Sequence, residues 1–97
     1  MARVDAILVG AYMNHADLSH ATLANANLSR AILDDANLRG ADLGGANLSG
    51  AQLGHTNLSG AILFDANLSG ANLVGANLTE TGMSRADLSD ANLNMPH

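Results

Sequence analysis

Three residues of this chain have the types and spacing of a possible metal site. His15, Asp35 and His55 follow one another at intervals of twenty residues. Imidazole nitrogen and carboxylate oxygen are common zinc ligands, and each must lie about 2.0–2.3 Å from the ion. Whether these three side chains can meet depends on how the intervening backbone folds.

No other group with catalytic potential stands in a recognisable pattern. Cysteine is absent, which removes disulfides and thiolate metal sites. The sequence has no nucleophile paired with a base and no glycine-rich loop before a predicted helix. We therefore predict that the protein is not an enzyme and has neither catalytic nor cofactor-binding residues.

A five-residue repeat runs through nearly the whole chain. Its commonest form is Ala46-Asn47-Leu48-Ser49-Gly50, and residues 66–70 repeat the same letters. We call the Leu of each unit its centre. From residue 8 to residue 93, sixteen of the eighteen centres are Leu, and the other two are Met13 and Met83. Two residues before the centre, Ala stands in sixteen units, and the exceptions are Thr56 and Thr81. A repeat without a break in register determines the fold.

This period fits neither an α-helix nor an unbroken strand. Five residues at about 100° each advance roughly 500°, so the Leu side chains would scatter around a helix. In a strand, side chains alternate between two faces, and an odd repeat would reverse the faces at every unit. The chain must therefore turn once per unit, with Ala and Leu facing inward.

The residue at each turn, which we call the corner, should tolerate a left-handed backbone. It is Gly in seven units and Asn, Asp or His in seven others, and these residues tolerate positive φ better than most. The four corners that depart from this preference are Arg30, Glu80, Arg85 and Met95.

The A-N-L-S-G pattern resembles the repeat of the pentapeptide-repeat proteins, and the resemblance covers essentially the whole chain. It implies an all-β fold, a right-handed quadrilateral parallel β-helix with four units and twenty residues per coil. The eighteen units then give about four and a half coils, and we expect a single domain over residues 1–97. The turn at each unit follows from the residues themselves, whereas the number of sides and the hand come from the resemblance.

Twenty residues per coil place residues that are twenty apart in one surface column. His15 and His55 are then two coils apart, roughly 9.6 Å at the spacing of neighbouring strands, which is too far to share one ion. We therefore predict no metal site. Asp65 and Arg85 share a corner column, where they can form an exposed ion pair.

Two further predictions concern hydrogen bonds. Stacked asparagine side chains can bond from coil to coil along columns such as Asn27, Asn47 and Asn67. Thr56 and Thr81, which replace inward Ala, are expected to bond backbone groups through their hydroxyls.

Large apolar residues at outward positions are the candidate protein-contact residues. Tyr12 and Ile32 stack in one column. Ile62 and Phe64 project from a single unit on the opposite side. The neighbouring positions are glycines, so we expect a raised apolar patch with gaps beside it, at Gly44 and Gly82.

Leu93, the last centre, is the fifth candidate contact residue. A coil with no coil after it leaves unpaired backbone groups and opens the apolar interior to water. We therefore expect a homo-oligomer through a coil end, in the simplest case a two-fold dimer through the C-terminal coil. The Ile62 and Phe64 patch is the rival interface.

The preferred function is a non-enzymatic structural or protein-interaction solenoid with an unknown protein partner and no cofactor. The formal net charge of −5 disfavours direct nucleic-acid binding, which requires a basic patch. The apolar run at residues 6–9 is far too short to span a membrane. We expect a cytoplasmic protein.

The alternative function comes from the resemblance. Quinolone-resistance members of the pentapeptide-repeat family are acidic rods that mimic DNA and inhibit or protect a type II topoisomerase, DNA gyrase. Those members are longer and dimerise through a C-terminal apolar cap. In this chain the acidic residues are spread over different sides, as are Asp17, Asp42 and Asp87.

Overall fold

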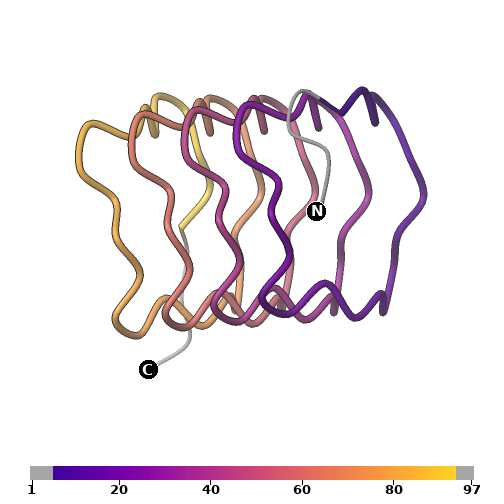
Figure 1. The fold of residues 1–97 in the computed structure, drawn as a ribbon. Helices are drawn as coiled ribbons and strands as arrows, with labels where there is room; N and C mark the ends of the chain where they lie inside the picture. The colour runs from indigo at the N-terminus through magenta and orange to yellow at the C-terminus, as the bar shows by residue number, and fades with distance from the viewer. Residues whose placement is uncertain (1–5, 94–97) are drawn as a thin grey trace.

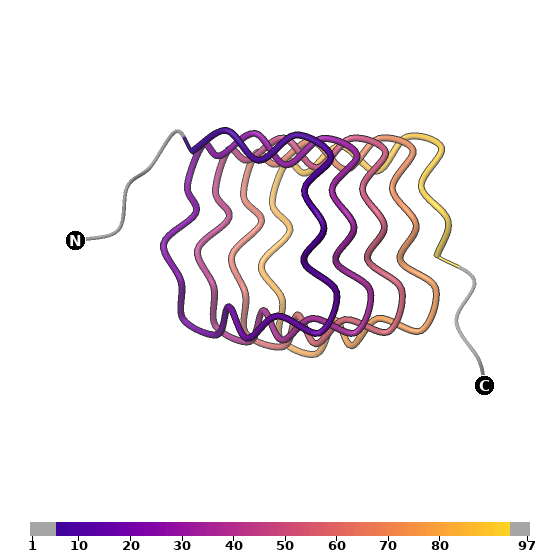
Figure 2. The same ribbon diagram turned by 90° about the vertical axis from the view of Figure 1, so that its right-hand side faces the viewer.

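The computed structural model describes residues 6–93, which wind into stacked coils along a common axis (Figures 1 and 2). This part of the chain contains no helix and no strand longer than one residue. Instead, the residue before each centre forms an isolated parallel bridge with the equivalent residue twenty positions away. The bridged residues are Ile7, Tyr12, Asp17, Thr22, Asn27, Ile32, Asn37, Asp42, Asn47, Gln52, Asn57, Ile62, Asn67, Asn72, Asn77, Gly82, Asp87 and Asn92. The domain predicted over residues 1–97 extends beyond the described part at both ends.

A four-residue turn separates each unit from the next. The carbonyl of the centre accepts the N–H of the residue three positions later, as in the 3.0 Å bond from Ala46 N to Leu43 O. The corner is the third residue of this turn and has positive φ, +66° at Gly50 and +56° at His55. Positive φ at this position is the mark of a type II turn. The prediction of a left-handed corner is therefore confirmed.

Three corners with unfavourable residue types adopt the same conformation. Arg30, Glu80 and Arg85 have φ values of 58°, 57° and 59°. For an L-residue with a Cβ this conformation costs roughly 1–2 kcal/mol, so the surrounding coils must stabilise it. Met95, the fourth exception, lies outside the described residues.

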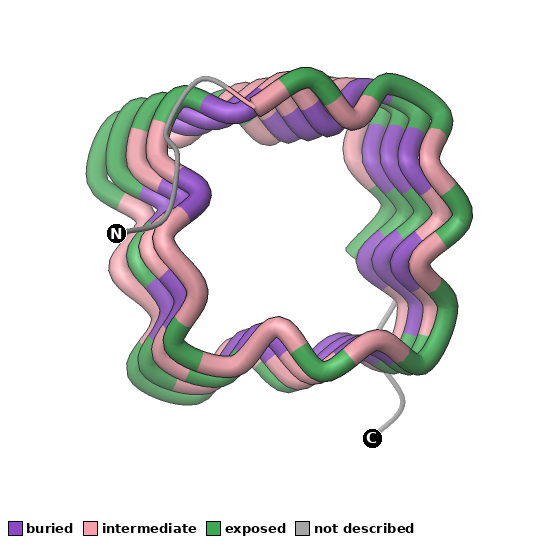
Figure 3. The backbone as a smooth tube through the Cα atoms, turned by 45° about the vertical axis from the view of Figure 1, so that its right-hand side comes forward, coloured by how far each residue is buried: buried purple, intermediate pink, exposed green. Residues whose placement is uncertain are grey.

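Four units complete one coil, which brings residues twenty apart into contact. Leu48 N–H donates to Asn67 O over 2.6 Å, and Asn67 N–H donates back to Ala46 O over 2.9 Å. Viewed along the axis, the coil has four sides, with the exposed residues concentrated toward the corners (Figure 3). The twenty-residue coil implied by the resemblance is therefore present.

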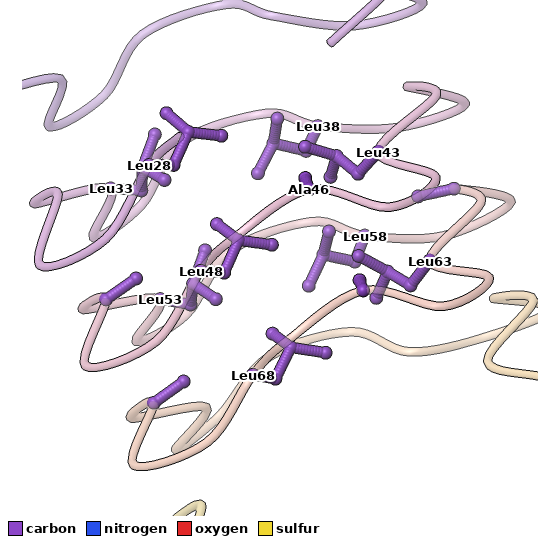
Figure 4. Packing of buried hydrophobic residues seen from close by; sticks show 14 of the residues in the cluster. Leu28, Leu33, Leu38, Leu43, Ala46, Leu48, Leu53, Leu58, Leu63 and Leu68 are labelled. Atoms are coloured by element: carbon purple, nitrogen blue, oxygen red, sulfur yellow. The ribbon is translucent and has the colours of Figure 1, made fainter. Parts of the chain in front are cut away.

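The interior is filled by the centres and by the Ala residues two positions before them. Leu28, Leu48 and Leu68 lie above one another inside one wall and are at most 1% exposed (Figure 4). Ala46, between them in the sequence, is also 1% exposed. Burying one Leu side chain stabilises a fold by about 1.5–3 kcal/mol, and here Leu48 has Leu28 and Leu68 at the equivalent positions of the two neighbouring coils.

The two threonines that replace inward Ala bond backbone carbonyls, as predicted. Thr56 is 1% exposed, and its hydroxyl donates to Leu53 O over 2.8 Å. The Thr81 hydroxyl donates to Leu58 O in the coil before it over 2.7 Å. Both polar groups are thus satisfied at the edge of an apolar core.

Candidate protein-contact site

Within residues 6–93, ten outward Asn and Asp side chains form a hydrogen bond within their own unit. The side-chain oxygen of the residue before the centre accepts the backbone N–H of the residue after the centre, as in the 3.0 Å bond from Ser49 N to Asn47 Oδ1. This local bond differs from the predicted coil-to-coil bonding, because the amide oxygen reaches a nearby N–H that the turn leaves unpaired. These Asn and Asp oxygens are therefore bonded within their own unit and not between coils.

Three of these oxygens, those of Asp17, Asn27 and Asp87, also accept a serine hydroxyl. The hydroxyl and then the backbone N–H of Ser19 hold the pKa of Asp17 below its ordinary value. Ser89 lowers the pKa of Asp87 in the same way. Both carboxylates are therefore stabilised in the ionised form on the outer surface.

Ile62 and Phe64 form the apolar patch that was predicted on one side. Their exposed fractions are 38% and 46%. The expected gap at Gly82 is filled, because the Phe64 ring leans toward the next coil. A Cβ added to Gly82 would lie 2.5 Å from Phe64 Cε1 and 3.0 Å from Cζ. The patch is thus flatter than predicted, since the ring rests on the glycine.

The side toward Gly44 is also partly covered. Asp42 Oδ1 accepts the Gly44 N–H over 3.0 Å, and it would lie 3.3 Å from a Cβ at Gly44. A partner seated on Ile62 and Phe64 would therefore meet a carboxylate on this side and small residues on the rest of the face, namely Ala24, Gly44, Gly82 and Ser84.

Tyr12 and Ile32 lie on the opposite side and bridge each other. Tyr12 is 86% exposed, and Ile32 is half-buried. The sequence interpretation missed Ile7 and Val9, which are exposed on the adjoining side of the same coil. Both occupy outward positions of the first unit, so the rule that identified Tyr12 would have found them too.

Leu93 lies in the last described unit and is 40% exposed. The centres before it in this coil are only partly buried, as are the first centres at the other end, and these are Leu8, Met13, Leu18, Leu78, Met83 and Leu88. The five predicted contact residues therefore do not form one site. They occupy one side, the opposite side and the C-terminal edge.

A groove of about 440 Å³ runs along one corner and was not predicted. It is hollow because Gly40 and Gly60 follow one another in a corner column, and a Cβ at Gly60 would meet nothing within 4 Å. The His20 ring lies against Gly40, and Arg39 and Glu80 also line the groove. Consecutive glycines in one column were the signal in the sequence.

Charged groups pair in the corner columns. Asp65 and Arg85 form the predicted ion pair, with 2.8 Å between Nε and Oδ1 and 3.1 Å between Nη2 and Oδ2. The pair is exposed, so its contribution to stability is small. His15 Nε2 lies 4.0 Å from Asp35 Oδ2.

Within residues 6–93, no three His, Asp or Glu side chains are grouped so that they could hold a metal ion. The same residues form no helix long and apolar enough to cross a bilayer.

Comparison with known proteins gives one consistent result. The family model for pentapeptide repeats matches residues 5–35, 41–79 and 56–94. The crystal structure of the pentapeptide repeat protein Rfr23 from the cyanobacterium Cyanothece 51142 has a TM-score of 0.86 and 41% identity, and the match covers 95% of this chain and 60% of that one.

Two other solved structures give similar agreement. HetL from Nostoc sp. strain PCC 7120, a pentapeptide repeat protein involved in heterocyst differentiation regulation, has a TM-score of 0.82 and 43% identity over 86% of this chain and 38% of its own. A pentapeptide repeat protein from the Arabidopsis thaliana thylakoid lumen has a TM-score of 0.89 and 31% identity over 95% of this chain and 65% of its own. This chain therefore spans less than two thirds of the length of each relative. None of the curated proteins compared with this sequence matches it.

Proposed function

Because the chain belongs to the pentapeptide-repeat family and folds as a right-handed β-helix, we propose that it is a non-enzymatic interaction solenoid. Its partner is a protein, which binds the face that carries Ile62 and Phe64. The interior supports this proposal, since the coils that carry the buried Leu and Ala residues leave no space for a ligand among them. Function must then come from the outer surface.

The position of Ile62 and Phe64 carries the proposal. The other large apolar residues exposed in the described part belong to its first coil or its last unit, where the structure describes a neighbouring coil on one side only, and they are Ile7, Val9, Tyr12 and Leu93. Ile62 instead bridges Asp42 on one side and Gly82 on the other. Ile62 and Phe64 are therefore exposed although a described coil lies on each side of them, because their side chains face outward.

The rest of the face suits a broad contact. Stable protein interfaces bury about 800 Å² on each partner, far more than two side chains supply. Small residues around the patch allow a partner backbone to approach closely, and the two large side chains are the natural anchors at the centre. HetL, which has the same fold, is involved in regulation, a role in keeping with an interaction module.

The DNA-mimic alternative is less well supported by the surface. Asp17, Asp42 and Asp87 lie on three different sides of the coil, because their positions differ by five or ten residues within the twenty-residue period. A duplex mimic needs its negative charge in continuous stripes. The charges of this chain are instead partly neutralised in pairs such as Asp65 with Arg85.

Capture from the native host tests the proposal. The tagged 97-residue chain is compared with Phe64→Asp and with Tyr12→Asp, a matched change of an exposed aromatic residue on the opposite side. We expect one protein to be retained by the unchanged chain and by Tyr12→Asp, and to be lost with Phe64→Asp. Equal retention by all three chains, or by none, would reject this face as the binding site.

A further inference from the structure

The floor of the corner groove is made of two successive corners without side chains. Gly40 N–H donates to Ser59 O and Gly60 N–H donates to Thr79 O, each over 2.9 Å, so the coils stay joined beneath the hollow. In the same corner column, His20 precedes Gly40 by one coil and Glu80 follows Gly60 by one coil. Both glycines therefore have a described coil on each side, and the hollow between them lies in the middle of the described part.

Arg39 lies beside this floor with a free guanidinium group. It is exposed and lines the groove. Its backbone N–H donates to Asn37 Oδ1 over 3.0 Å, but no residue in the described part accepts a hydrogen bond from its side chain, and the ion pairs found there join other residues. A guanidinium carries five N–H donors in a planar fork that matches a carboxylate or a phosphate. Arg39 can therefore anchor an oxyanion in the groove.

Two hydroxyl groups continue the line of donors along the groove. Ser59 and Thr79 occupy the positions equivalent to Arg39 in the next two coils, about 4.8 Å apart per coil, and both line the groove. Their backbone N–H groups are bonded to Asn57 Oδ1 and Asn77 Oδ1, each over 3.0 Å. Their hydroxyls form no hydrogen bond with any described residue, so both are available to a ligand.

The charged groups are arranged so that an anion belongs at the Arg39 end. The His20 ring lies against Gly40 at this end. Asp17, on the same side of the coil, does not line the groove and already accepts the hydroxyl and the backbone N–H of Ser19. Glu80 lines the groove two coils from Gly40, roughly 9.6 Å away at the spacing of neighbouring strands. Its carboxylate disfavours an anion at the far end.

We propose that the corner groove binds a small molecule through an oxyanion, a carboxylate or a phosphate, that sits beside Arg39 and accepts the Ser59 hydroxyl. The remainder of the molecule lies over the glycine floor toward Thr79. The groove volume of about 440 Å³ falls within the range of small-molecule sites, about 300–1,000 Å³. Because the groove is open and polar, we expect millimolar affinity. This inference does not rest on the function proposed for the Ile62 and Phe64 face.

Nuclear magnetic resonance titration of the ¹⁵N-labelled 97-residue chain tests the inference. Inorganic phosphate and succinate are added in separate titrations, with sodium chloride at matched ionic strength as the reference. We expect saturable shifts of the Gly40, Ser59 and Gly60 amides with one or both probes, and the probe that acts identifies the oxyanion. The proposal is overturned if neither probe gives saturable shifts at these amides, or if chloride gives the same shifts.

A pair of arginine variants identifies the anchor. Arg39→Gln should weaken binding of the active probe at least about tenfold, as expected when hydrogen bonds to a charged group are lost. Arg30→Gln is the matched control, because it removes the same charge at the opposite corner of the coil and should leave the affinity unchanged. Equal weakening by both changes would assign the effect to net charge and reject the groove.

A second pair of variants tests the hollow itself and retains both arginines. Ser59→Leu fills the space over the glycine floor and removes the hydroxyl, so it should abolish saturable binding. Ser49→Leu makes the same change on the opposite side of the coil and should bind like the unchanged chain. Circular dichroism melting verifies that all four variants are folded. Undiminished binding by Ser59→Leu would show that the oxyanion does not sit in the groove.

Discussion

The Phe64 ring lies over Gly82 in the next coil, and other outward side chains lean in the same direction. The His20 ring lies against Gly40, and the His55 ring lies against Gly75. Gly40 and Gly75 combine two roles, since they also supply positive φ at a corner. At the residue scale, each of these three rings therefore lies against a glycine about one coil later.

A double-mutant cycle tests the contact between Phe64 and Gly82. Gly82 does not have positive φ, so its backbone can accept Ala, but the added methyl would force the Phe64 ring away. Because the ring is the exposed end of a flexible side chain, the cost should be small. We expect a coupling of about 0.5 kcal/mol or more between Gly82→Ala and Phe64→Ala in urea unfolding. If Gly82→Ala has the same effect with and without the ring, the two residues are not in contact.

The corners show how far single residues could be predicted. The position in the repeat predicted positive φ at every described corner. Arg30, Glu80 and Arg85 have positive φ although their residue types disfavour it. The direction in which Phe64 leans could not be predicted in this way. The repeat tells only that the side chain faces outward, whereas its lean depends on the space left by a residue in another coil.

At the scale of the five-residue element, one side is set by packing and the other by local hydrogen bonds. Ala and Leu fill the inside because the coil is narrow, and this was predicted from residue size and spacing. The outward asparagines were expected to bond between coils. Their oxygens instead bond the N–H two residues later, since that group is close by and has no place in the ladder.

Overpacking one element tests the narrow interior. Ala46→Leu introduces three extra carbon atoms at a site that is 1% exposed and should lower the free energy of unfolding by about 1–3 kcal/mol. Ala24→Leu makes the same change at an outward position beside Gly44 and should have little effect. The measurement is urea unfolding of both variants, and equal stabilities would contradict the inward assignment of Ala46.

At the scale of the whole molecule, the residues required a turn in every unit but did not determine its angle. Four sides and the right hand were therefore available only through the family resemblance. The corner groove was not predicted, because it arises where Gly40 and Gly60 become neighbours only after the coil closes.

The assignment of every surface residue depends on the claim that residues twenty apart are neighbours. The chain contains no cysteine, so paired substitutions can test this claim by oxidation. A disulfide requires Cα atoms about 4.4–6.8 Å apart, and neighbouring strands lie about 4.8 Å apart. Asn47→Cys with Asn67→Cys joins two bridged residues, whereas Asn47→Cys with Asn57→Cys joins residues on opposite sides.

Non-reducing electrophoresis of the two oxidised double variants at low protein concentration is therefore the most direct measurement. We predict that the pair at 47 and 67 forms an intramolecular disulfide, seen as a faster band that disappears on reduction. The pair at 47 and 57, although closer in sequence, should remain reduced. Equal cross-linking of both pairs, or cross-linking of the 47 and 57 pair alone, would contradict the twenty-residue coil.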